Sequence, residues 1–400
     1  MVSSTSTAQT SERCADLFRA LDEHTGAAVD LRRRLHAEPR LSGEERDTTA
    51  TLMDAMGFTD GLFPKGGAVL RVGDPDGPSI GLRAELDALP VRETTDVEWR
   101  SHSGAMHACG HDVHMAATVA LVRALRDVGA PLPLVVVLQP REETVPSGAQ
   151  DIALSSTFAD HDIRAFLGAH VQPTLPRGCF SASPGPVNAA ADQFAIEVRG
   201  RPGHAAYPHL TADPVVAAAD LVGSLQHLVS RQVDPTHPTV LTVGSISGGN
   251  SPNVVPATVR MRGILRTFDE HDRVRLHRAI EETTRSVTDV HGCDSLVEVT
   301  LGAPVLVNDK ALAASATGWL QRAGLSPAPP LRSCGADDFS YYCTLVPSLM
   351  VFVGVGSENG DDPGLHHPDF LPPDESVGDV ARAMLAGYLA ARDTVADRAA

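Results

Sequence analysis

The chain has 400 residues, more than the ~250 to 300 over which a single hydrophobic core keeps growing, so two domains are expected. Its composition, 42% hydrophobic and 21% charged, is that of a folded globular protein, and its net charge of −17 excludes nucleic acid as a partner, because phosphate backbones bind clustered Lys and Arg. Six scattered cysteines, no signal peptide and no apolar run of ~20 residues predict a cytoplasmic protein that does not cross a membrane.

The first half of the chain predicts a parallel sheet flanked by helices. After a short disordered tail expected over residues 1–13, near-continuous apolar runs at 79–86, 133–140 and 163–171 are typical of strands covered on both faces. Between the first two runs, residues 115–129 have the apolar period of a helix and end on a glycine. This order of strand, helix and strand is a βαβ unit.

From about residue 188 the pattern changes to that of a ferredoxin-like unit, with elements in the order βαββαβ. We therefore predict an α/β catalytic domain over 12–187 and 304–400, interrupted by an inserted domain over 188–303. The expected elements of the insert are strands at 193–200, 239–249, 258–267 and 295–302 and helices at 213–229 and 269–292.

Reactive side chains collect at the carboxyl ends of the predicted strands, where ligands bind in open α/β sheets. Thiolate, imidazole and carboxylate together are donors that suit zinc or a neighbouring transition metal. A single catalytic zinc normally takes three protein ligands, so a larger set fits two ions with a shared ligand. We expect two divalent ions, zinc first, with manganese, cobalt and nickel compatible. The predicted ligands are Cys109, His111, Glu143, His170 and His366.

The adjacent pair Glu142 and Glu143 predicts a division of roles. If Glu143 binds metal, its neighbour cannot easily do the same, but Glu142 can serve as a general base for water. An alternative is that Cys109 is a nucleophile paired with His111. Their i, i+2 spacing is awkward for proton transfer, and this alternative leaves the downstream glutamates and histidines without a role.

These motifs resemble the metal-dependent M20 peptidase superfamily, in particular the amidohydrolase branch that includes hippurate hydrolases, N-acyl-amino-acid amidohydrolases and hydrolases of indole-3-acetic acid conjugates. The resemblance rests on GLRAELDALPV, MHACGHDVH, LQPREE, GAHV, GRPGHAAYPH, SPNVVPATV, GADDFSYY and LHHPDF, between residues 81 and 370. It implies a zinc-exopeptidase-like catalytic domain whose inserted domain is a lid that also forms a homodimer. The five ligands and the base Glu142 fall on the family's positions.

The resemblance also implies roles for residues outside the ligand set. Asp87 falls where the family keeps an acidic residue behind the metal, and His204 where relatives supply a donor to the scissile carbonyl, often from the partner subunit. Asn253 and Arg266 fall where related enzymes hold the substrate, with Arg266 placed to pair with a carboxylate. Asp112 is expected either in the first turn of its helix or behind a ligand.

The predicted function is metal-dependent hydrolysis of the amide bond of an N-acyl amino acid, or of a related small amide, to a carboxylate and an amine. The alternatives are a dipeptidase or aminopeptidase on the same scaffold, or a metal-binding relative without turnover. Three departures from the family pattern affect the expected substrate pocket: Arg141 in place of a small residue, TVPSG in place of glycine-rich sequence, and Asp337–Asp338 in place of a Glu-Asp pair.

Overall fold

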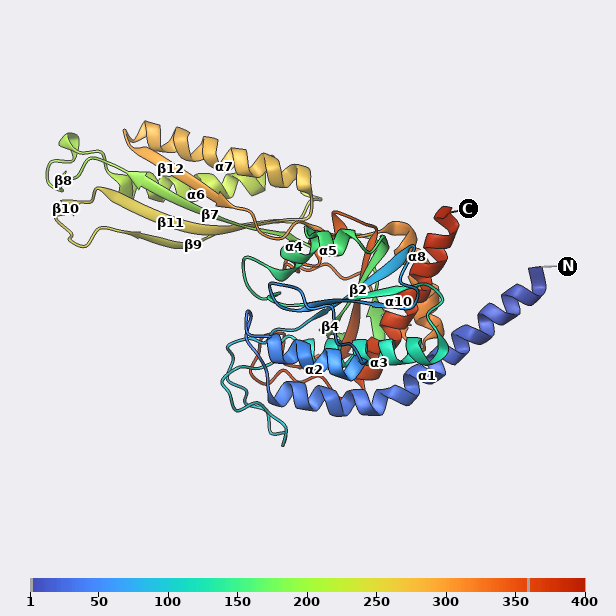
Figure 1. The fold of residues 1–400 in the computed structure, drawn as a ribbon. Helices are drawn as coiled ribbons and strands as arrows, with labels where there is room; N and C mark the ends of the chain where they lie inside the picture. The colour runs from blue at the N-terminus through green and yellow to red at the C-terminus, as the bar shows by residue number, and fades with distance from the viewer. Residues whose placement is uncertain (1–2, 358–359, 400) are drawn as a thin grey trace. The chain divides into compact units, whose positions relative to one another are not determined.

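The computed structural model describes residues 3–357 and 360–399, and the chain divides into two compact units. The first unit comprises Met1–Gly185, Val307–Leu331 and Tyr341–Ala400, and the second comprises Pro186–Leu306 and Arg332–Ser340 (Figure 1). The strands β6 (Gly185–Asn188) and β13 (Leu306–Asn308) and the short helix α9 (Ser340–Cys343) lie where the chain passes from one unit to the other.

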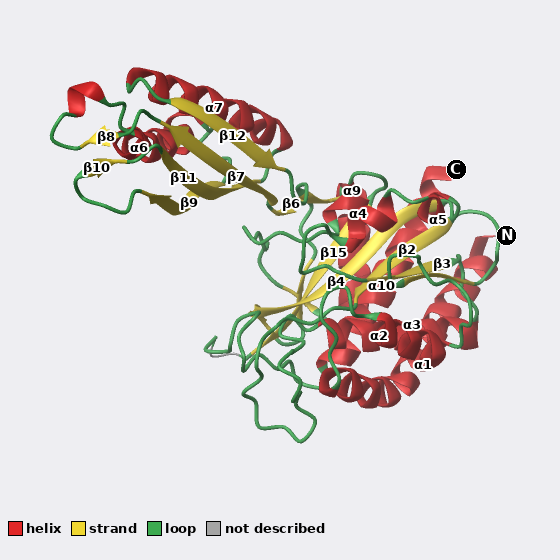
Figure 2. Cartoon of the chain, turned by 60° about the vertical axis from the view of Figure 1, so that its left-hand side comes forward, coloured by secondary structure: helices red, strands yellow, loops and turns green. Residues whose placement is uncertain are grey.

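The first unit is built on a seven-stranded sheet in the order β1-β3-β2-β4-β15-β5-β14. Its central strands β3, β2, β4 and β15 are parallel, and they run side by side in Figure 2. Strands β2, β3 and β15 are buried at every position, as expected for near-continuous apolar runs. The strands are β1 (Ala68–Val72), β2 (Ser79–Glu85), β3 (Leu134–Gln139), β4 (Ile163–Pro176), β5 (Cys179–Ser181), β14 (Ser326–Pro327) and β15 (Ser348–Gly356).

Helices pack on this sheet, with α1 against α3 and α10, and α10 also against α8. Helix α3 begins after Gly110 and ends before Gly129, and both glycines have positive φ angles that other residues rarely adopt. The helices of the unit are α1 (Ser3–Ala37), α2 (Arg46–Met56), α3 (His111–Val128), α4 (Gly148–Ala153), α5 (Ser156–Ala159), α8 (Lys310–Arg322) and α10 (Ser376–Ala399).

The disordered tail expected at the N-terminus is wrong for the residues that the structure describes, because α1 is already helical at Ser3. Residues 1–2 lie outside the described part. Further along α1, Cys14, Leu17 and Leu21 are buried in the core. Once packing fixes that stretch, each added helical residue gains a backbone hydrogen bond without a new nucleation cost, which favours extension toward the N-terminus.

The second unit is a four-stranded antiparallel sheet, ordered β12-β7-β11-β9, with helices α6 and α7. Its element order is the predicted βαββαβ, and a short β8-β10 ribbon extends it. The elements are β7 (Ala190–Arg199), β8 (Gly203–His204), the 3-10 turn η1 (Pro208–Leu210), α6 (Pro214–Gln232), β9 (Thr239–Gly248), β10 (Val254–Val255), β11 (Thr258–Thr267), α7 (Glu270–Val290) and β12 (Asp294–Thr300).

The mixed α/β fold predicted from the sequence is confirmed, whereas the roles of the two domains stay predictions. The observed division differs from the predicted one in one segment: Arg332–Ser340, predicted within the catalytic domain, groups with the second unit. Among the described residues, every helix is too short or too polar to span a lipid bilayer.

Candidate metal centre

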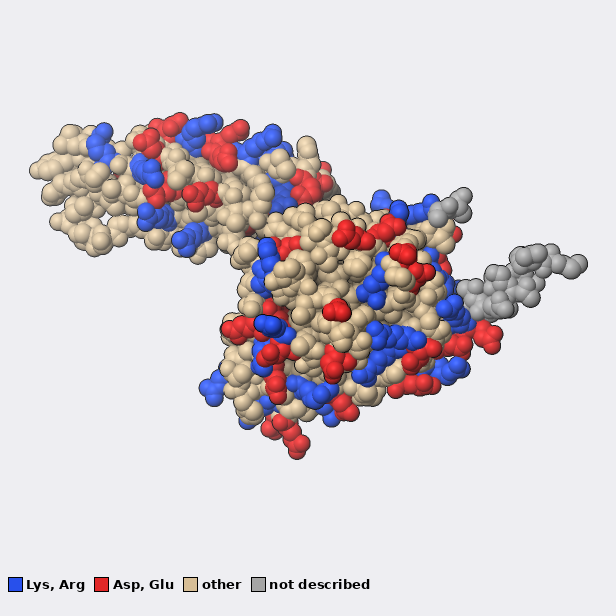
Figure 3. Space-filling model, viewed as in Figure 1, with Lys and Arg blue, Asp and Glu red and all other residues tan. Residues whose placement is uncertain are grey.

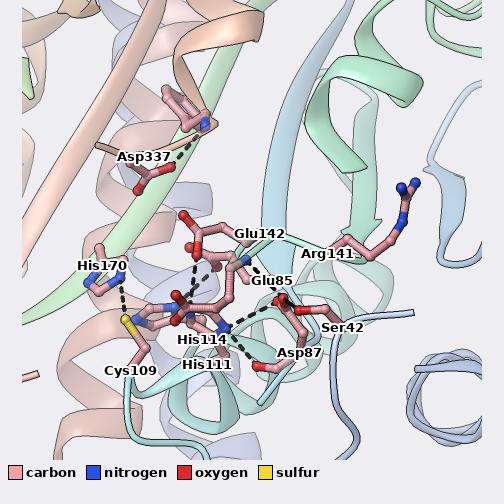
Figure 4. Close-up of polar contacts among 12 residues, drawn as sticks. Ser42, Glu85, Asp87, Cys109, His111, His114, Arg141, Glu142, His170 and Asp337 are labelled. Carbon is pink, nitrogen blue, oxygen red and sulfur yellow. Dashed lines mark hydrogen bonds and ion pairs between the residues drawn. The ribbon is translucent and has the colours of Figure 1, made fainter. Parts of the chain in front are cut away.

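Three of the predicted ligands come together at the carboxyl edge of the first unit's sheet. Cys109 lies in the turn before α3, His111 is the first residue of α3, and His170 lies within β4. The Cys109 Sγ is 3.6 Å from His170 Nε2, and Figure 4 shows the sulfur turned toward that ring. The ligand atoms of all three residues lie within 4.8 Å of one another and are buried. They form one compact group of a sulfur and two nitrogen donors.

A second group contains Cys109 again, with Glu143 and His366 inside the same 4.8 Å limit. The loop after β15 carries His366, whose backbone N–H donates to Ala108 O at 2.8 Å and whose Nε2 is 3.4 Å from Glu143 Oε1. His366 has a φ of 66°, a costly conformation for a residue other than glycine that persists mostly at functional sites. The structure therefore gathers all five predicted ligands into two groups that meet at Cys109.

Two backbone carbonyls fix which nitrogen the histidines turn toward this centre. His111 Nδ1 donates to Asp87 O at 2.8 Å, and His170 Nδ1 donates to Val171 O at 2.7 Å. Each ring therefore carries a proton on Nδ1, which leaves Nε2 as the nitrogen that can bind metal. Among the described residues, the buried His111 Nε2 has no hydrogen-bond partner, and the buried Glu143 Oε1 has only the ion-pair contact with His366. These donors fit a divalent cation, since buried polar atoms otherwise require a partner.

The predicted base lies beside the same centre. Glu142 Oε2 is 4.0 Å from His111 Nε2, and Glu142 and Glu143 form a further candidate group with His111. Asp87 holds the loop that carries both glutamates, because its Oδ2 accepts the Glu143 backbone N–H at 2.9 Å and the Ser42 hydroxyl at 2.7 Å. Its other oxygen is 3.5 Å from His111 Nδ1. Asp87 thus connects a ligand histidine to the glutamate loop.

Arg141 does not point into the metal centre. Its guanidinium is 2.6 Å from Asp151 and donates to Pro146 O at 3.1 Å, and Figure 4 shows the side chain extending away from the cluster. Its backbone N–H donates to Glu45 Oε1 at 2.8 Å, and its φ of 55° lies in the left-handed region. The residue that departs from the family pattern therefore shapes the backbone before the glutamate pair, and its charge is neutralised elsewhere.

Electrostatics disfavour Cys109 as a nucleophile in the metal-free protein. Burial raises the pKa of its thiol and outweighs the lowering by His111, whereas a nucleophilic cysteine needs a lowered pKa. Burial acts to lower the pKa of His111, but contacts with Asp87 and Cys109 more than compensate and raise it. The Glu143 pKa is lowered, because His366 and His111 outweigh the cost of burial. The thiol gains its charge most readily when a cation binds it.

His114, which the sequence predicts as a supporting side chain, and Glu85 at the end of β2 lie behind His170. His114 Nε2 accepts the Val171 backbone N–H at 3.0 Å, so its Nδ1 carries the proton donated to Glu85 Oε2 at 3.1 Å. Glu85 in turn pairs with Arg83. Although Glu85, His111 and His114 lie close enough to hold an ion, both nitrogens of His114 are already engaged. His114 is therefore a support for β4 beside His170.

The chain is similar to known proteins over most of its length. The model of peptidase family M20/M25/M40 matches residues 81–390. The chain belongs to this family. An N-acetyl-L-cysteine deacetylase of Bacillus subtilis is 34% identical over 362 residues, with 87% of this chain and 84% of that protein covered. An N-acetyldiaminopimelate deacetylase of Halalkalibacterium halodurans is 32% identical, with 90% and 98% covered.

Among solved structures, a dinuclear metal-binding peptidase of the M20 family from Bacillus subtilis superposes with a TM-score of 0.80 at 26% identity, covering 92% of this chain and 98% of that one. The predicted family and reaction class are confirmed: this M20 protein is a hydrolase of amide C–N bonds. Its ligand groups and its family support divalent metal ions.

Of the remaining predicted residues of this M20 protein, Asp112 lies in the first turn of α3, and the other three lie in the second unit. His204 and Asn253 are neighbours on the β8-β10 ribbon, where the Ala205 N–H donates to Asn253 O at 3.0 Å, and both side chains are exposed. Arg266 lies near the end of β11, opposite Ala191 of β7, and is half-buried. Burial lowers the pKa of Arg266 despite the nearby Asp192. The structure thus groups His204 with Asn253 and places Arg266 at a separate position.

Proposed function

We propose that this protein is a dinuclear metal-dependent deacylase of N-acyl amino acids, with N-acetyl amino acids as its first substrate class. The supporting observation is the pair of ligand groups that share Cys109, because two ions with one common ligand would use all five side chains. The named relatives that are N-acetylcysteine and N-acetyldiaminopimelate deacetylases support the acetyl group. We propose zinc as the first metal, with manganese, cobalt or nickel as possible replacements.

Glu142 is the proposed proton carrier of the reaction. Bound divalent ions would supply Lewis-acid polarisation of the amide carbonyl and make water more acidic. Glu142 would accept a proton from the attacking water and return it to the nitrogen of the leaving amine. Its carboxylate lies next to His111 and Glu143, and Asp87 holds the backbone of that loop. Because Asp87 holds this loop in place, Glu142 can transfer the proton while Glu143 remains a metal ligand.

His204 is the proposed donor to the carbonyl oxygen. The Ala206 N–H donates to His204 Nδ1 at 3.1 Å, so this nitrogen keeps its lone pair and the proton resides on Nε2 of an exposed ring. An N–H that faces outward can stabilise negative charge that develops on a substrate oxygen. We assign substrate contacts to Asn253 and Arg266 as well, with Arg266 paired to the α-carboxylate.

A homodimer formed through the second unit and a cytoplasmic location complete the proposal. Strand β9 is an edge strand, and Tyr207, Leu210 and Val254 are exposed apolar residues near the β8-β10 ribbon. That end of the unit shows few charged side chains in Figure 3. Such edges and patches favour association with another chain. The scattered cysteines suit a reducing compartment.

The test is metal content together with amine release from a panel of N-acetyl amino acids and unblocked dipeptides. We expect about two divalent ions per chain, as in a dinuclear hydrolase, and turnover of blocked substrates only. Glu142→Gln should retain both ions and lose at least about a hundredfold in kcat. Preference for dipeptides would favour a peptidase, and full activity of Glu142→Gln would overturn the assigned base.

A further inference from the structure

A buried cluster of ionic side chains lies beneath the metal centre and is centred on helix α1. Arg32 and His36, one helical turn apart, are both fully buried, as is Asp112 of α3. Arg32 Nε donates to Asp112 Oδ2 at 3.0 Å, and His36 Nδ1 is 3.0 Å from the same oxygen. Asp112 directly follows the ligand His111 in the first turn of α3. Two cations of α1 therefore hold the residue next to a metal ligand.

Arg32 also binds the segment that follows His366. Its Nη1 donates to Asp374 Oδ1 at 3.0 Å, and its Nη2 donates to Pro372 O at 2.6 Å. Together with the bond to Asp112, all three nitrogens of the guanidinium are used, each toward a different acceptor. A rigid, planar fork of this kind fixes the relative positions of its acceptors, which a lysine cannot do. Arg32 thereby connects the start of α3 to the loop of His366.

His36 extends the same connection toward Cys109. Its Nε2 is 3.1 Å from Glu93 Oε1, and Glu93 also accepts the Ser101 N–H at 2.7 Å. Glu93 belongs to the long segment between β2 and α3, which closes on itself where Leu89 and Met106 exchange backbone hydrogen bonds of 2.9 and 3.0 Å. Met106 is three residues before Cys109. The imidazole of His36 thus bridges α3 and the segment that leads into the cysteine ligand.

We propose that Arg32 and His36 are positioning residues for the metal centre, which hold the segments carrying Cys109, His111 and His366 in the arrangement that binds metal. The inference rests on the proposed metal site. Its physical basis is that Arg32 and His36 are buried and bind residues adjacent to the ligands. Removing Arg32 takes one of its two counter-charges from Asp112, and removing His36 takes the other and also leaves Glu93 without its imidazole partner, so the ligand-bearing segments must shift.

If Arg32 served only the stability of the fold, a different result would be expected, and the second unit contains a matched control residue. Arg273 of α7 is nearly buried and also binds several acceptors, with Asp192 at 2.8 and 2.6 Å, Glu270 at 3.1 Å and Gly302 O at 3.1 Å. If buried guanidinium clusters serve only stability, Arg32→Met and Arg273→Met should behave alike. If Arg32 positions ligands, only Arg32→Met should change metal binding.

The experiment measures cobalt binding to the metal-free full-length protein by its visible absorption, with a competing chelator to extend the range. We expect Arg32→Met to weaken cobalt affinity by about tenfold or more, because residues behind metal ligands contribute about 10- to 100-fold. Arg273→Met should stay within about twofold of the unmodified protein, because distant sites act independently. The cobalt–thiolate absorption should also change in Arg32→Met, since it reports the geometry at Cys109.

His36 supplies a second pair of variants in case Arg32→Met does not fold. The amide nitrogen of asparagine lies near the position of Nδ1, and that of glutamine near Nε2. His36→Asn should therefore keep the bond to Asp112 beside His111 and lose the contact with Glu93, which reaches Cys109 through a longer segment, so cobalt affinity should fall by about threefold; His36→Gln, which loses the bond beside His111, should lose about tenfold. Equal affinities in both variants, or an equal loss in Arg273→Met, would overturn the inference. An unmodified protein that binds no cobalt would instead refute the proposed metal site itself.

Discussion

The stability of the metal-free protein should depend on the protonation of His36 at alkaline pH. Burial disfavours its charged form, but Asp112 and Glu93 outweigh that cost and raise the pKa of His36 from 6.5 to about 9. Asp112 faces it from α3, Glu93 and Trp99 from the segment before α3, and His107 from the turn before Cys109, at a ring distance of 6.4 Å. On α1 itself, Arg32 shares the Asp112 oxygen with His36, and Arg32 and Arg33 lie over the Trp99 ring.

The size of the effect follows from this shift. A rise from 6.5 to about 9 corresponds to about 3 kcal/mol in favour of the folded protein with His36 charged. Because the folded pKa is the higher one, this stabilisation is fully present below pH 6.5 and disappears as the pH rises through about 9. Asp112 and Glu93, whose pKa values are lowered, stay ionised throughout this range.

The assay compares the unmodified protein with His36→Asn, whose side chain does not titrate. In chelated samples, the Tm difference between the two should be about 5 °C or more near pH 6 and approach zero near pH 10. Titration of the histidine carbons by NMR should show one resonance, absent from the variant, with a midpoint near 9. Parallel Tm profiles, or a His36 midpoint near 6.5, would refute the reasoning.

Three further predictions concern the proposed reaction. Arg266→Gln should raise KM for N-acetyl amino acids by about tenfold to a hundredfold, as expected for a lost bond to a charged group, and should leave KM unchanged for the matching amino-acid amides; steady-state kinetics on both series would check this. His204→Ala should lower kcat by about 100- to 1,000-fold with little change in KM, as for a lost oxyanion donor. A chelator should abolish activity and added zinc restore it, while iodoacetamide should leave the metal-loaded protein active because Cys109 is buried and is proposed to bind the metal.

Much of the fold follows from local pattern, because the central strands are buried on both faces. The apolar runs predicted at 79–86 and 133–140 correspond closely to β2 and β3, and the run predicted at 163–171 corresponds to the first part of β4. The polar segment Ser3–Arg13 gave no such signal, and its helix depends on the packing of the residues that follow it. Local sequence predicts helices and strands well where burial sets the apolar pattern, and poorly where contacts with distant residues determine whether a segment is ordered.

The candidate site divides in the same way. The five proposed ligands could be located from sequence because they lie near the carboxyl ends of predicted strands, which the direction of a parallel sheet brings to one edge. Arg32 and His36 could not, because RRRLH on a helix has the pattern of a solvated basic face. Only the tertiary structure shows that Asp112 and Asp374, 80 and 342 residues away from Arg32, turn this face inward. Arg32 and His36 are four residues apart, which places them on one face of a helix, but this spacing is common and by itself does not indicate burial.

The buried carboxylates of the Arg32–His36 cluster and those of the metal centre have different charged partners. Asp112 is bound by Arg32 and His36, so the protein's own cations neutralise it. Asp87 accepts a hydroxyl and a backbone N–H on one oxygen and has His111 3.5 Å from the other, and Glu143 lies beside His366, so the charged partners of both are titratable imidazoles rather than a guanidinium. Burying negative charge is costly unless a cation lies nearby, and Cys109 adds another potential anion at this place. The charge balance therefore distinguishes Asp112, which the protein's own cations neutralise, from the proposed ligand Glu143, whose charge a divalent ion would balance.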